Sequence, residues 1–183
     1  TKLSANTITH GLLGATGLIG SAVAARLQAD GHEVDGVTRT LDSVARRVPV
    51  ARWLTFDLRA MTRPEDWLPH LEGIEAVVNC AGALQDNVRD SVDRVHRDSP
   101  SALWRACARA GVRRVIHFSA IGVDRGGLSP FSRSKAEGDA ALERSELDWV
   151  ILRPSVVVGR AAYGGCGLFR GVAGAPVGPR IPG

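Results

Sequence analysis

Three glycines spaced three residues apart form the part of this sequence with the most specific chemistry. The run Gly14–Gly20 (GATGLIG) follows an apolar segment that ends at Leu13 and precedes a helical pattern. In such a run the first glycine permits a tight turn, the second lets a pyrophosphate approach the backbone, and the third allows close helix packing. The helix N-terminus adds free N–H groups and a partial positive charge. We therefore expect a dinucleotide-binding turn rather than a merely tight connection, with cofactor contacts from Gly14, Thr16, Gly17, Leu18, Ile19 and Gly20.

The end of the second expected strand decides which dinucleotide is preferred. A carboxylate at that point would bind the adenosine ribose and repel a 2′-phosphate. Here the strand ends at Thr38, followed by Arg39, while the acids Glu33 and Asp35 lie too early in the strand. A small neutral residue followed by arginine suits a 2′-phosphate through charge-assisted hydrogen bonds. The pattern favours NADP(H), with NAD(H) as second choice; the alternative is that Arg39 simply points to solvent.

The elements that must position these residues alternate regularly along the chain. Apolar, β-rich runs alternate with helical patterns, which is typical of βαβ units around a parallel sheet. We expect an α/β fold with a doubly wound parallel sheet (a Rossmann fold) and right-handed crossovers that place helices on both faces. His10 and Gly11 are unusual in a buried strand and leave the length of the first strand open. The expected strands end at Leu13 or cover 32–38, 52–56, 76–80, 114–118 and 149–152, and the expected helices cover 18–30, 64–71, 92–110 and 130–144.

A change in composition divides the chain into two parts. Residues 1–158 carry the alternating pattern and form the expected dinucleotide-binding domain. Residues 159–183 are rich in glycine and proline, show little periodicity and end without a terminal helix. Such a stretch is a linker or the start of a further region. We expect it to begin a substrate region of which most is missing.

Composition and charge exclude several classes of protein. The chain has 183 residues, of which 44% are hydrophobic, which suits one domain. The net charge of +4 is scattered among acids, and its densest cluster, Arg46-Arg47, lacks nearby aromatics, so we expect no nucleic-acid partner. No apolar run is long enough to span a bilayer, and residues 1–10 carry no secretory signal. Cys80, Cys107 and Cys166 lack metal or redox spacing, so we expect free thiols, no metal and a cytoplasmic location.

Several motifs together resemble the extended and atypical short-chain dehydrogenase/reductase superfamily. Within it the chain is similar to NAD-dependent epimerase/dehydratase-like proteins related to the dinucleotide-binding accessory subunit of respiratory complex I. The resemblance implies a small-molecule substrate and a homodimer paired through the helices next to Lys135. The motifs that carry it are Gly14–Gly20, Asp57-Leu58, Asn79-Cys80-Ala81-Gly82, Phe131-Ser132-Arg133-Ser134-Lys135 and the run 152–159 (LRPSVVVG).

The resemblance also implies cofactor contacts along the chain. Asp57 would accept from the adenine amino group beside Leu58, and Lys135 would hydrogen-bond the nicotinamide ribose. The alternatives are an exposed strand-end acid for Asp57 and a solvated helix residue for Lys135. The remaining expected contacts are Cys80, Ala81 and Gly82 near the cofactor ribose, and Pro154, Ser155 and Val156 beside the carboxamide.

Two departures from the family pattern concern catalysis. Phe131 stands where the family's catalytic tyrosine is expected, and phenylalanine has no hydroxyl to give or take a proton. Ala120 stands at the position of the partner serine, with Ser119 one residue early. Losing a general acid typically removes about 10²–10⁴-fold in rate. The reductase interpretation is weakened accordingly.

Three residues remain as catalytic candidates: Lys135, Ser119 and His96. His96 would polarise a substrate or replace the missing acid; the alternative is a hydrogen-bonded structural histidine, and His117 is expected in the core. Two functions stay open. One is an NADP(H)-dependent oxidoreductase or epimerase-like enzyme, which obtains its proton from the substrate, from His96 or from the missing region. The other is a non-catalytic dinucleotide-binding protein acting in complex assembly or redox sensing.

Overall fold

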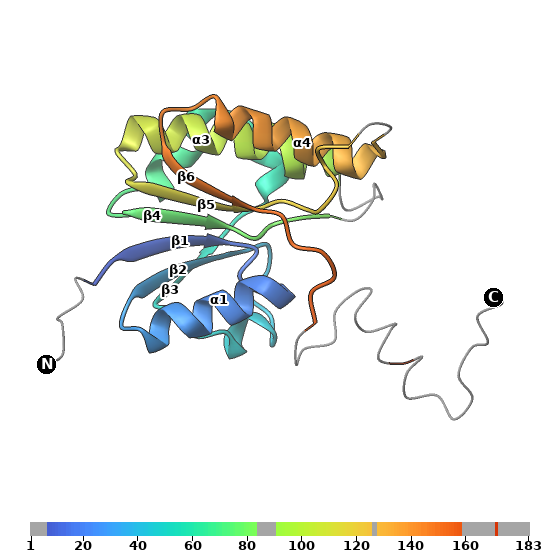
Figure 1. Ribbon diagram of the computed structural model, residues 1–183. Coiled ribbons are helices and arrows are strands. Elements are labelled where there is room, and N and C mark those ends of the chain that lie inside the picture. The colour runs from blue at the N-terminus through green and yellow to red at the C-terminus, as the bar shows by residue number, and fades with distance from the viewer. Residues whose placement is uncertain (1–6, 84–90, 126–127, 159–170, 172–183) are drawn as a thin grey trace, which may run out of the picture.

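Parallel strands form one sheet, which places the carboxyl ends of all its strands at the same edge. The computed structural model describes residues 7–83, 91–125, 128–158 and 171 (Figure 1). Within these ranges the sheet has six strands in the order β3-β2-β1-β4-β5-β6. The strand order reverses between β1 and β4, which creates a switch point where such folds bind ligands. This order confirms the predicted doubly wound fold. The strands are β1 (Thr9–Leu13), β2 (Glu33–Thr38), β3 (Arg52–Thr55), β4 (Ala76–Asn79), β5 (Arg114–Phe118) and β6 (Asp148–Leu152).

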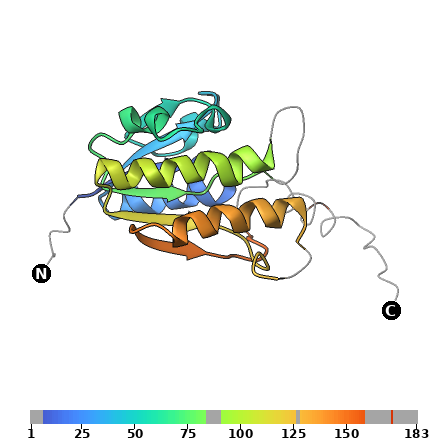
Figure 2. The same cartoon turned by 90° about the horizontal axis from the view of Figure 1, so that it is seen from above.

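Helices cover both faces of the sheet. Helix α1 (Leu18–Ala29) lies on one face, and α3 (Ser99–Ala110) and α4 (Pro130–Glu143) lie side by side on the other (Figures 1 and 2). Gly111 ends α3 in the left-handed region at φ 73°, as glycine readily does. Short helical pieces complete the connections: η1 (Ala45–Arg47), η2 (Leu58–Ala60), α2 (Pro64–Trp67), η3 (Leu68–His70) and η4 (Arg94–Asp98).

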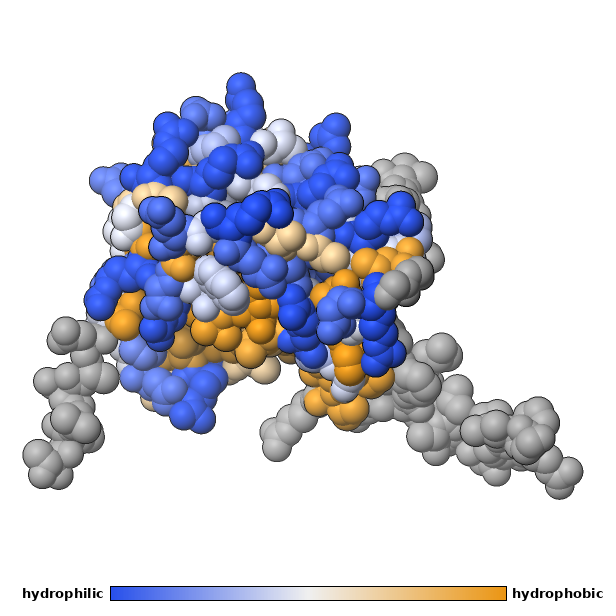
Figure 3. All heavy atoms as spheres, turned by 45° about the horizontal axis from the view of Figure 1, so that its top comes forward, coloured by the Kyte–Doolittle hydropathy of each residue, from blue (hydrophilic) through white to orange (hydrophobic). Residues whose placement is uncertain are grey.

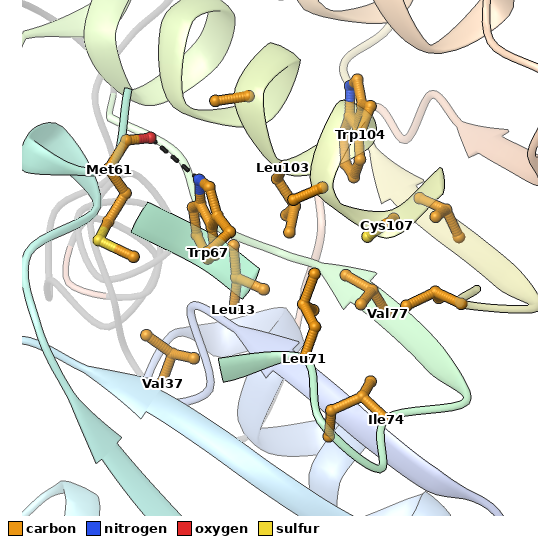
Figure 4. Close-up of a cluster of buried hydrophobic side chains, with 14 of the residues drawn as sticks. Leu13, Val37, Met61, Trp67, Leu71, Ile74, Val77, Leu103, Trp104 and Cys107 are labelled. Carbon is orange, nitrogen blue, oxygen red and sulfur yellow. Dashed lines mark hydrogen bonds between the residues drawn. The ribbon is translucent and has the colours of Figure 1, made fainter. Parts of the chain in front are cut away.

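The main core lies between the sheet and the α3/α4 layer. Trp67 and Trp104 are each 1% exposed and pack among aliphatic side chains of β1, β4 and α3 (Figure 4). The Trp67 indole Nε1 donates to the Met61 carbonyl at 3.0 Å, which satisfies its polar atom inside the core. A second cluster around Leu12 and Ala24 holds α1 against the opposite face. Both faces of the central strands are covered, and all four residues of β4 are buried.

The first strand tolerates its histidine. His10 is 7% exposed within β1, and its Nδ1 lies 3.2 Å from the Ile8 carbonyl oxygen, to which it donates. Burial lowers the pKa of His10, which keeps the ring neutral. The imidazole of His32 packs against it edge-on, with ring centroids 5.1 Å apart. The strand therefore covers residues 9–13 despite its unusual composition.

The predicted helix 92–110 is interrupted by a π-helical segment. In η4 the Ser99 amide donates to the Arg94 carbonyl, five residues earlier. Pro100 has no N–H and cannot donate to the carbonyl of His96, four residues before it. The His96 carbonyl instead lies against α4 at Gly138. A Cβ added to Gly138 would lie 2.1 Å from the His96 oxygen. A proline on one helix and a glycine on its neighbour thus produce the interruption.

The predicted second region, 159–183, lies outside the described residues except for Gly171, and so does Cys166. Cys80 and Cys107 are free thiols. Burial raises the pKa of each to about 12, so neither ionises near neutral pH.

Replacing Gly138 with alanine tests the contact between η4 and α4. Alanine in a helix interior is normally more favourable than glycine by about 0.5–1 kcal/mol. Here we expect the free energy of unfolding to fall by about 1–3 kcal/mol, because the new Cβ overlaps the His96 carbonyl. Urea unfolding followed by circular dichroism measures the change. Arg133→Ala, an exposed change on α4, is the control and should stay within about 0.5 kcal/mol. Stabilisation by Gly138→Ala would contradict the contact.

Candidate functional site

The glycine turn is held directly against the end of β4. Gly14 has φ +69°, and a Cβ there would lie 2.8 Å from the backbone of Cys80 and Ala81. A Cβ on Gly20 would lie 2.1 Å from the Gly14 carbonyl oxygen. The Gly17 amide donates to the same oxygen at 2.9 Å. Because backbone meets backbone at each point, only glycine fits at positions 14 and 20.

The start of α1 presents backbone donors at this turn. Gly17 is the N-cap of α1 and has no side chain to occupy the first amide groups, and the first turn of α1 carries no acid. A Cβ on Gly17 would meet Gly14 O at 3.2 Å and nothing nearer among the described residues. The first-turn amides and the positive end of the helix dipole therefore suit a pyrophosphate. The turn fits the predicted dinucleotide.

A cleft of about 210 Å³ opens at the carboxyl ends of β1 to β4, next to this turn. Ten predicted cofactor-binding residues line it: Gly14, Thr16, Gly17, Thr38, Arg39, Asp57, Leu58, Cys80, Ala81 and Gly82. The sequence reasoning missed five others: Val37, Phe56, Arg59, Ala83 and Val95. Four of these are sequence neighbours of predicted residues, so a rule that extends each motif by two positions would have found them. Val95 comes from η4, and no local signal indicates it.

Two strand ends shape the walls of the cleft. The Phe56 amide donates to the Thr38 carbonyl at 3.1 Å, so the segments after β2 and β3 run side by side. At β4, buried Asn79 accepts from the Ala81 amide at 3.0 Å through Oδ1. Its Nδ2 donates to His117 Nδ1 at 3.2 Å. His117 is 2% exposed, a core histidine as predicted.

Other predicted cofactor residues lie around a second, apolar hollow of about 410 Å³. Leu18 and Ile19 line it together with Phe118 and Val157. Pro154 accepts from the Ile121 amide at 3.0 Å and so runs beside the segment after β5. An apolar area is exposed below the charged α3/α4 layer (Figure 3). In β6 and the segment after it, the large exposed apolar side chains are Trp149, Val150, Leu152, Val156 and Val158.

Lys135 is buried beside the cleft rather than solvated. Its side chain donates from Nζ to the Phe118 carbonyl at 3.0 Å, and Nζ lies 3.8 Å from the position of a Cβ on Gly82. Burial lowers the pKa of Lys135 to about 8, opposed by the charge of Asp139. The ring of Phe131 lies near this amine, with its centroid 5.9 Å from Nζ. No hydroxyl is present on that ring.

His96 is fixed by hydrogen bonds on both ring nitrogens. Nε2 accepts from the Ala83 amide at 2.9 Å. Nδ1 lies 3.0 Å from the Ser134 hydroxyl, which donates to the Phe131 carbonyl, so Nδ1 must be the donor. Burial, with the nearby charge of Lys135, lowers the pKa of His96 to about 3. The neutral ring matches the structural alternative; its catalytic role stays a prediction.

Ser119 points into the sheet–helix interface instead of the cleft. Its hydroxyl donates to Asp139 Oδ2 at 2.8 Å, and Arg153 Nε donates to the same oxygen at 3.1 Å. Asp139 is 2% exposed, and burial raises its pKa, but His117 first, then Ser119 and Arg153, hold that pKa below the usual range. The catalytic role predicted for Ser119 would require this bond to break.

Fold and cleft together define a dinucleotide-binding protein with its glycine turn at the switch point of a doubly wound sheet. The profile of the NAD(P)H-binding family matches residues 14–166, and the chain belongs to this family. This membership fits the extended and atypical short-chain dehydrogenase/reductase superfamily inferred from the motifs.

The curated relatives are longer proteins. The chain is 28% identical over 175 residues to ceramide reductase of Caulobacter vibrioides, covering 92% of this chain and 52% of that protein. It is 32% identical over 168 residues to sterol demethylase protein B of Methylococcus capsulatus, covering 80% of this chain and 50% of that protein. The chain thus spans about half the length of these relatives.

Solved structures share the fold. WbmG of Bordetella bronchiseptica in complex with NAD matches with a TM-score of 0.71 at 20% identity, covering 90% of this chain and 58% of that chain. The oxidoreductase ylbE of Lactococcus lactis matches with a TM-score of 0.68 at 20% identity, covering 84% and 71%. Across the described residues, no helix is long and apolar enough to cross a membrane, and no cluster of metal-binding side chains occurs.

The buried position of Lys135 predicts an unusual titration. The chain has only two lysines, Lys2 and Lys135, so ¹³Cε-lysine NMR gives two resonances. We expect one to titrate near pH 8, because burial disfavours the ammonium form. Lys135→Met identifies that resonance by removing it.

The same shift predicts a pH dependence of stability. Between pH 8 and about 10.5 the unfolded chain binds more protons at Lys135 than the folded chain does. The free energy of unfolding should therefore rise with pH over this window in wild type relative to Lys135→Met, by roughly 1–3 kcal/mol. A difference between the two proteins that stays flat across the window would show that Lys135 is solvated.

Proposed function

We propose that this chain is the NADP(H)-binding part of an oxidoreductase of the atypical short-chain dehydrogenase/reductase type. The observation that carries the proposal is the glycine turn, packed backbone to backbone on β4 with the uncapped start of α1 beside the cleft. Membership of the NAD(P)H-binding family supports a nicotinamide dinucleotide as the cofactor. The names of two relatives, a ceramide reductase and a sterol demethylase protein, support redox chemistry.

The choice of NADP(H) over NAD(H) is supported by the end of β2. Thr38 is neutral and donates through its hydroxyl to the Thr40 carbonyl at 2.9 Å. Asp35, the nearest acid in β2, is 5% exposed and bonded to Arg52 at 2.6 Å. Its carboxylate is therefore engaged at the neighbouring strand β3. Arg39 lines the cleft directly after Thr38, where a 2′-phosphate would gain a charge-assisted hydrogen bond.

At the nicotinamide end, residues of this chain would bind the cofactor ribose and exclude water. When bound, the nicotinamide ring supplies hydride transfer. Lys135, positioned by Phe118 O beside Gly82, is placed to hydrogen-bond the cofactor ribose. Ile19 and Val157 line the apolar hollow at the start of α1, where they would exclude water from the reacting face. The substrate-binding side chains belong to the proposed region after residue 158.

A specific observation favours a second function, dinucleotide binding without catalysis in complex assembly or redox sensing. Phe131 has no hydroxyl, the Ser119 hydroxyl is bound to Asp139, and both nitrogens of His96 are occupied. Of the catalytic candidates this leaves only Lys135 as a proton donor, and its Nζ already donates to the Phe118 carbonyl. The unidentified small-molecule substrate, the homodimer and the cytoplasmic location stay predictions under either function.

Gly17→Val tests the binding site itself. The valine side chain would stand in front of the first-turn amides of α1, where the pyrophosphate is proposed to lie. We expect Kd for NADPH, measured by its fluorescence, to rise at least about tenfold, equivalent to 1.4 kcal/mol. The matched control is Ala25→Val, which adds the same side chain to an exposed position of α1. If the folded Gly17→Val and Ala25→Val variants bind NADPH with equal Kd, the cofactor does not bind at the start of α1.

The double substitution Phe131→Tyr/Ala120→Ser separates the two functions. It places a hydroxyl beside Lys135 and a second after β5, so that carbonyl reduction gains a proton donor. The full-length protein should be used, with a panel of aldehydes, ketones and quinones. We expect wild type to bind NADPH but reduce the panel slowly, and the double variant to gain about tenfold or more in kcat, with similar Kd for NADPH. Fast wild-type turnover with a pH profile that the variant leaves unchanged would assign the proton to another group.

A further inference from the structure

The carboxylate of Asp57 accepts hydrogen bonds from the neighbouring Arg59. Its Oδ1 accepts from the Arg59 amide and from Arg59 Nε, both at 3.0 Å. Its Oδ2 accepts from Nε at 2.9 Å and from Nη2. The two contacts of Nε share one hydrogen, so three N–H groups of Arg59 bond a carboxylate that is 35% exposed and also lines the cleft. Asp57 thus holds the Arg59 guanidinium in one orientation.

Arg59 and Arg39 lie at the same end of the cleft. Both line it, and the bond from the Phe56 amide to the Thr38 carbonyl joins the segments that carry them. The charge of Arg39 contributes to the lowered pKa of Asp57, after the larger contribution of the hydrogen bonds from Arg59. Arg94 donates from Nη1 to the Arg59 carbonyl at 3.3 Å, which steadies the backbone of this turn.

Arg39 and Arg59 both bring positive charge to this end of the cleft, and both act on the charge of Asp57. Dinucleotides bound at a glycine turn place their adenosine half at the ends of the strands β2 and β3 in a sheet of this order. A 2′-phosphate is a compact anion with three acceptor oxygens, and the planar fork of arginine binds such a group through two parallel hydrogen bonds. A guanidinium already oriented by a carboxylate loses less side-chain entropy on binding.

We infer that Arg59 is a second specificity-determining residue, which contacts the 2′-phosphate of NADP(H) together with Arg39, and that Asp57 is a positioning residue acting through Arg59. The inference rests on the proposed cofactor site and gives it a residue that the sequence motifs do not indicate. It is an alternative to the expected contact of Asp57 with the adenine amino group, which stays a prediction that the same experiment tests. The two interpretations differ in what they require of NADH, which has the adenine but lacks the phosphate.

The test compares Kd for NADPH and for NADH in the same variants. Arg59→Ala should weaken NADPH about 10- to 100-fold, the equivalent of one or two hydrogen bonds to a charged group, and change NADH by less than about threefold. Arg39→Ala should show the same selective loss. Arg59→Lys should give an intermediate value, because lysine keeps the charge but not the fork. It also keeps the test valid if Arg59→Ala folds poorly.

The matched control is Arg63→Ala. Arg63 bonds Asp66 at 2.7 Å, its side chain is 75% exposed, and it does not line the cleft. The substitution Arg63→Ala removes the same charge from a similar ion pair. If Arg63→Ala weakens NADPH as much as Arg59→Ala does, the loss reflects long-range charge alone and overturns the inference.

Asp57→Asn tests the positioning role. It should leave NADH within about threefold, and its shift of the NADPH-to-NADH ratio should vanish in the Arg59→Ala background, because Asp57 acts through Arg59. A tenfold loss of NADH affinity would instead assign Asp57 to the adenine. Equal losses of both cofactors in Arg59→Ala would overturn the role of Arg59 while the proposed function stands. Wild-type protein that binds neither cofactor would overturn both.

Discussion

The site depends on one backbone contact, the approach of Gly20 to the Gly14 carbonyl. That contact fixes where α1 begins relative to β1, and Gly14 in turn lies against Cys80 and Ala81 at the end of β4. The consecutive elements β1 and α1 therefore meet the distant strand β4 without an intervening side chain. The geometry resists small adjustments, because a backbone cannot change rotamer to relieve an overlap. The dipole of α1 and the strand ends that line the cleft take their places relative to this contact.

A second backbone contact, between His96 and Gly138, governs the other side of the site. Pro100 deprives the His96 carbonyl of its usual helical donor, and the π-helical turn directs that carbonyl at α4. The His96 ring then reaches Ser134 and Ala83, and so connects α4 to the segment after β4. The position of Lys135, one turn before Gly138 on the same helix, is tied to this arrangement. The two sides of the cleft are thus set by glycines that admit a neighbouring backbone.

Local spacing was sufficient to predict the fold and most of the cleft. Period, turn residues and strand-end positions are properties of neighbouring residues, which explains why the sheet, the glycine turn and Thr38-Arg39 were predicted. Arg59 directly follows the predicted contact Leu58 and was missed because the family motif ends there. The orientation of Ser119 and the tautomer of His96 depend on partners 20 and 38 residues away, Asp139 and Ser134. No periodicity encodes such distant hydrogen bonds.

The two edges of the sheet differ in their resistance to self-association. At β3 the edge strand has four residues and carries Arg52, a charge that discourages another strand from pairing. At β6 the edge exposes Trp149, Val150 and Leu152, each at least 36% exposed in the part of the chain that the structure describes. An apolar, unpaired strand edge is a template for intermolecular β-pairing. Within the described residues β6 is therefore the more apolar of the two edge strands, and Val150→Lys would give its centre a charge like the one that Arg52 gives β3.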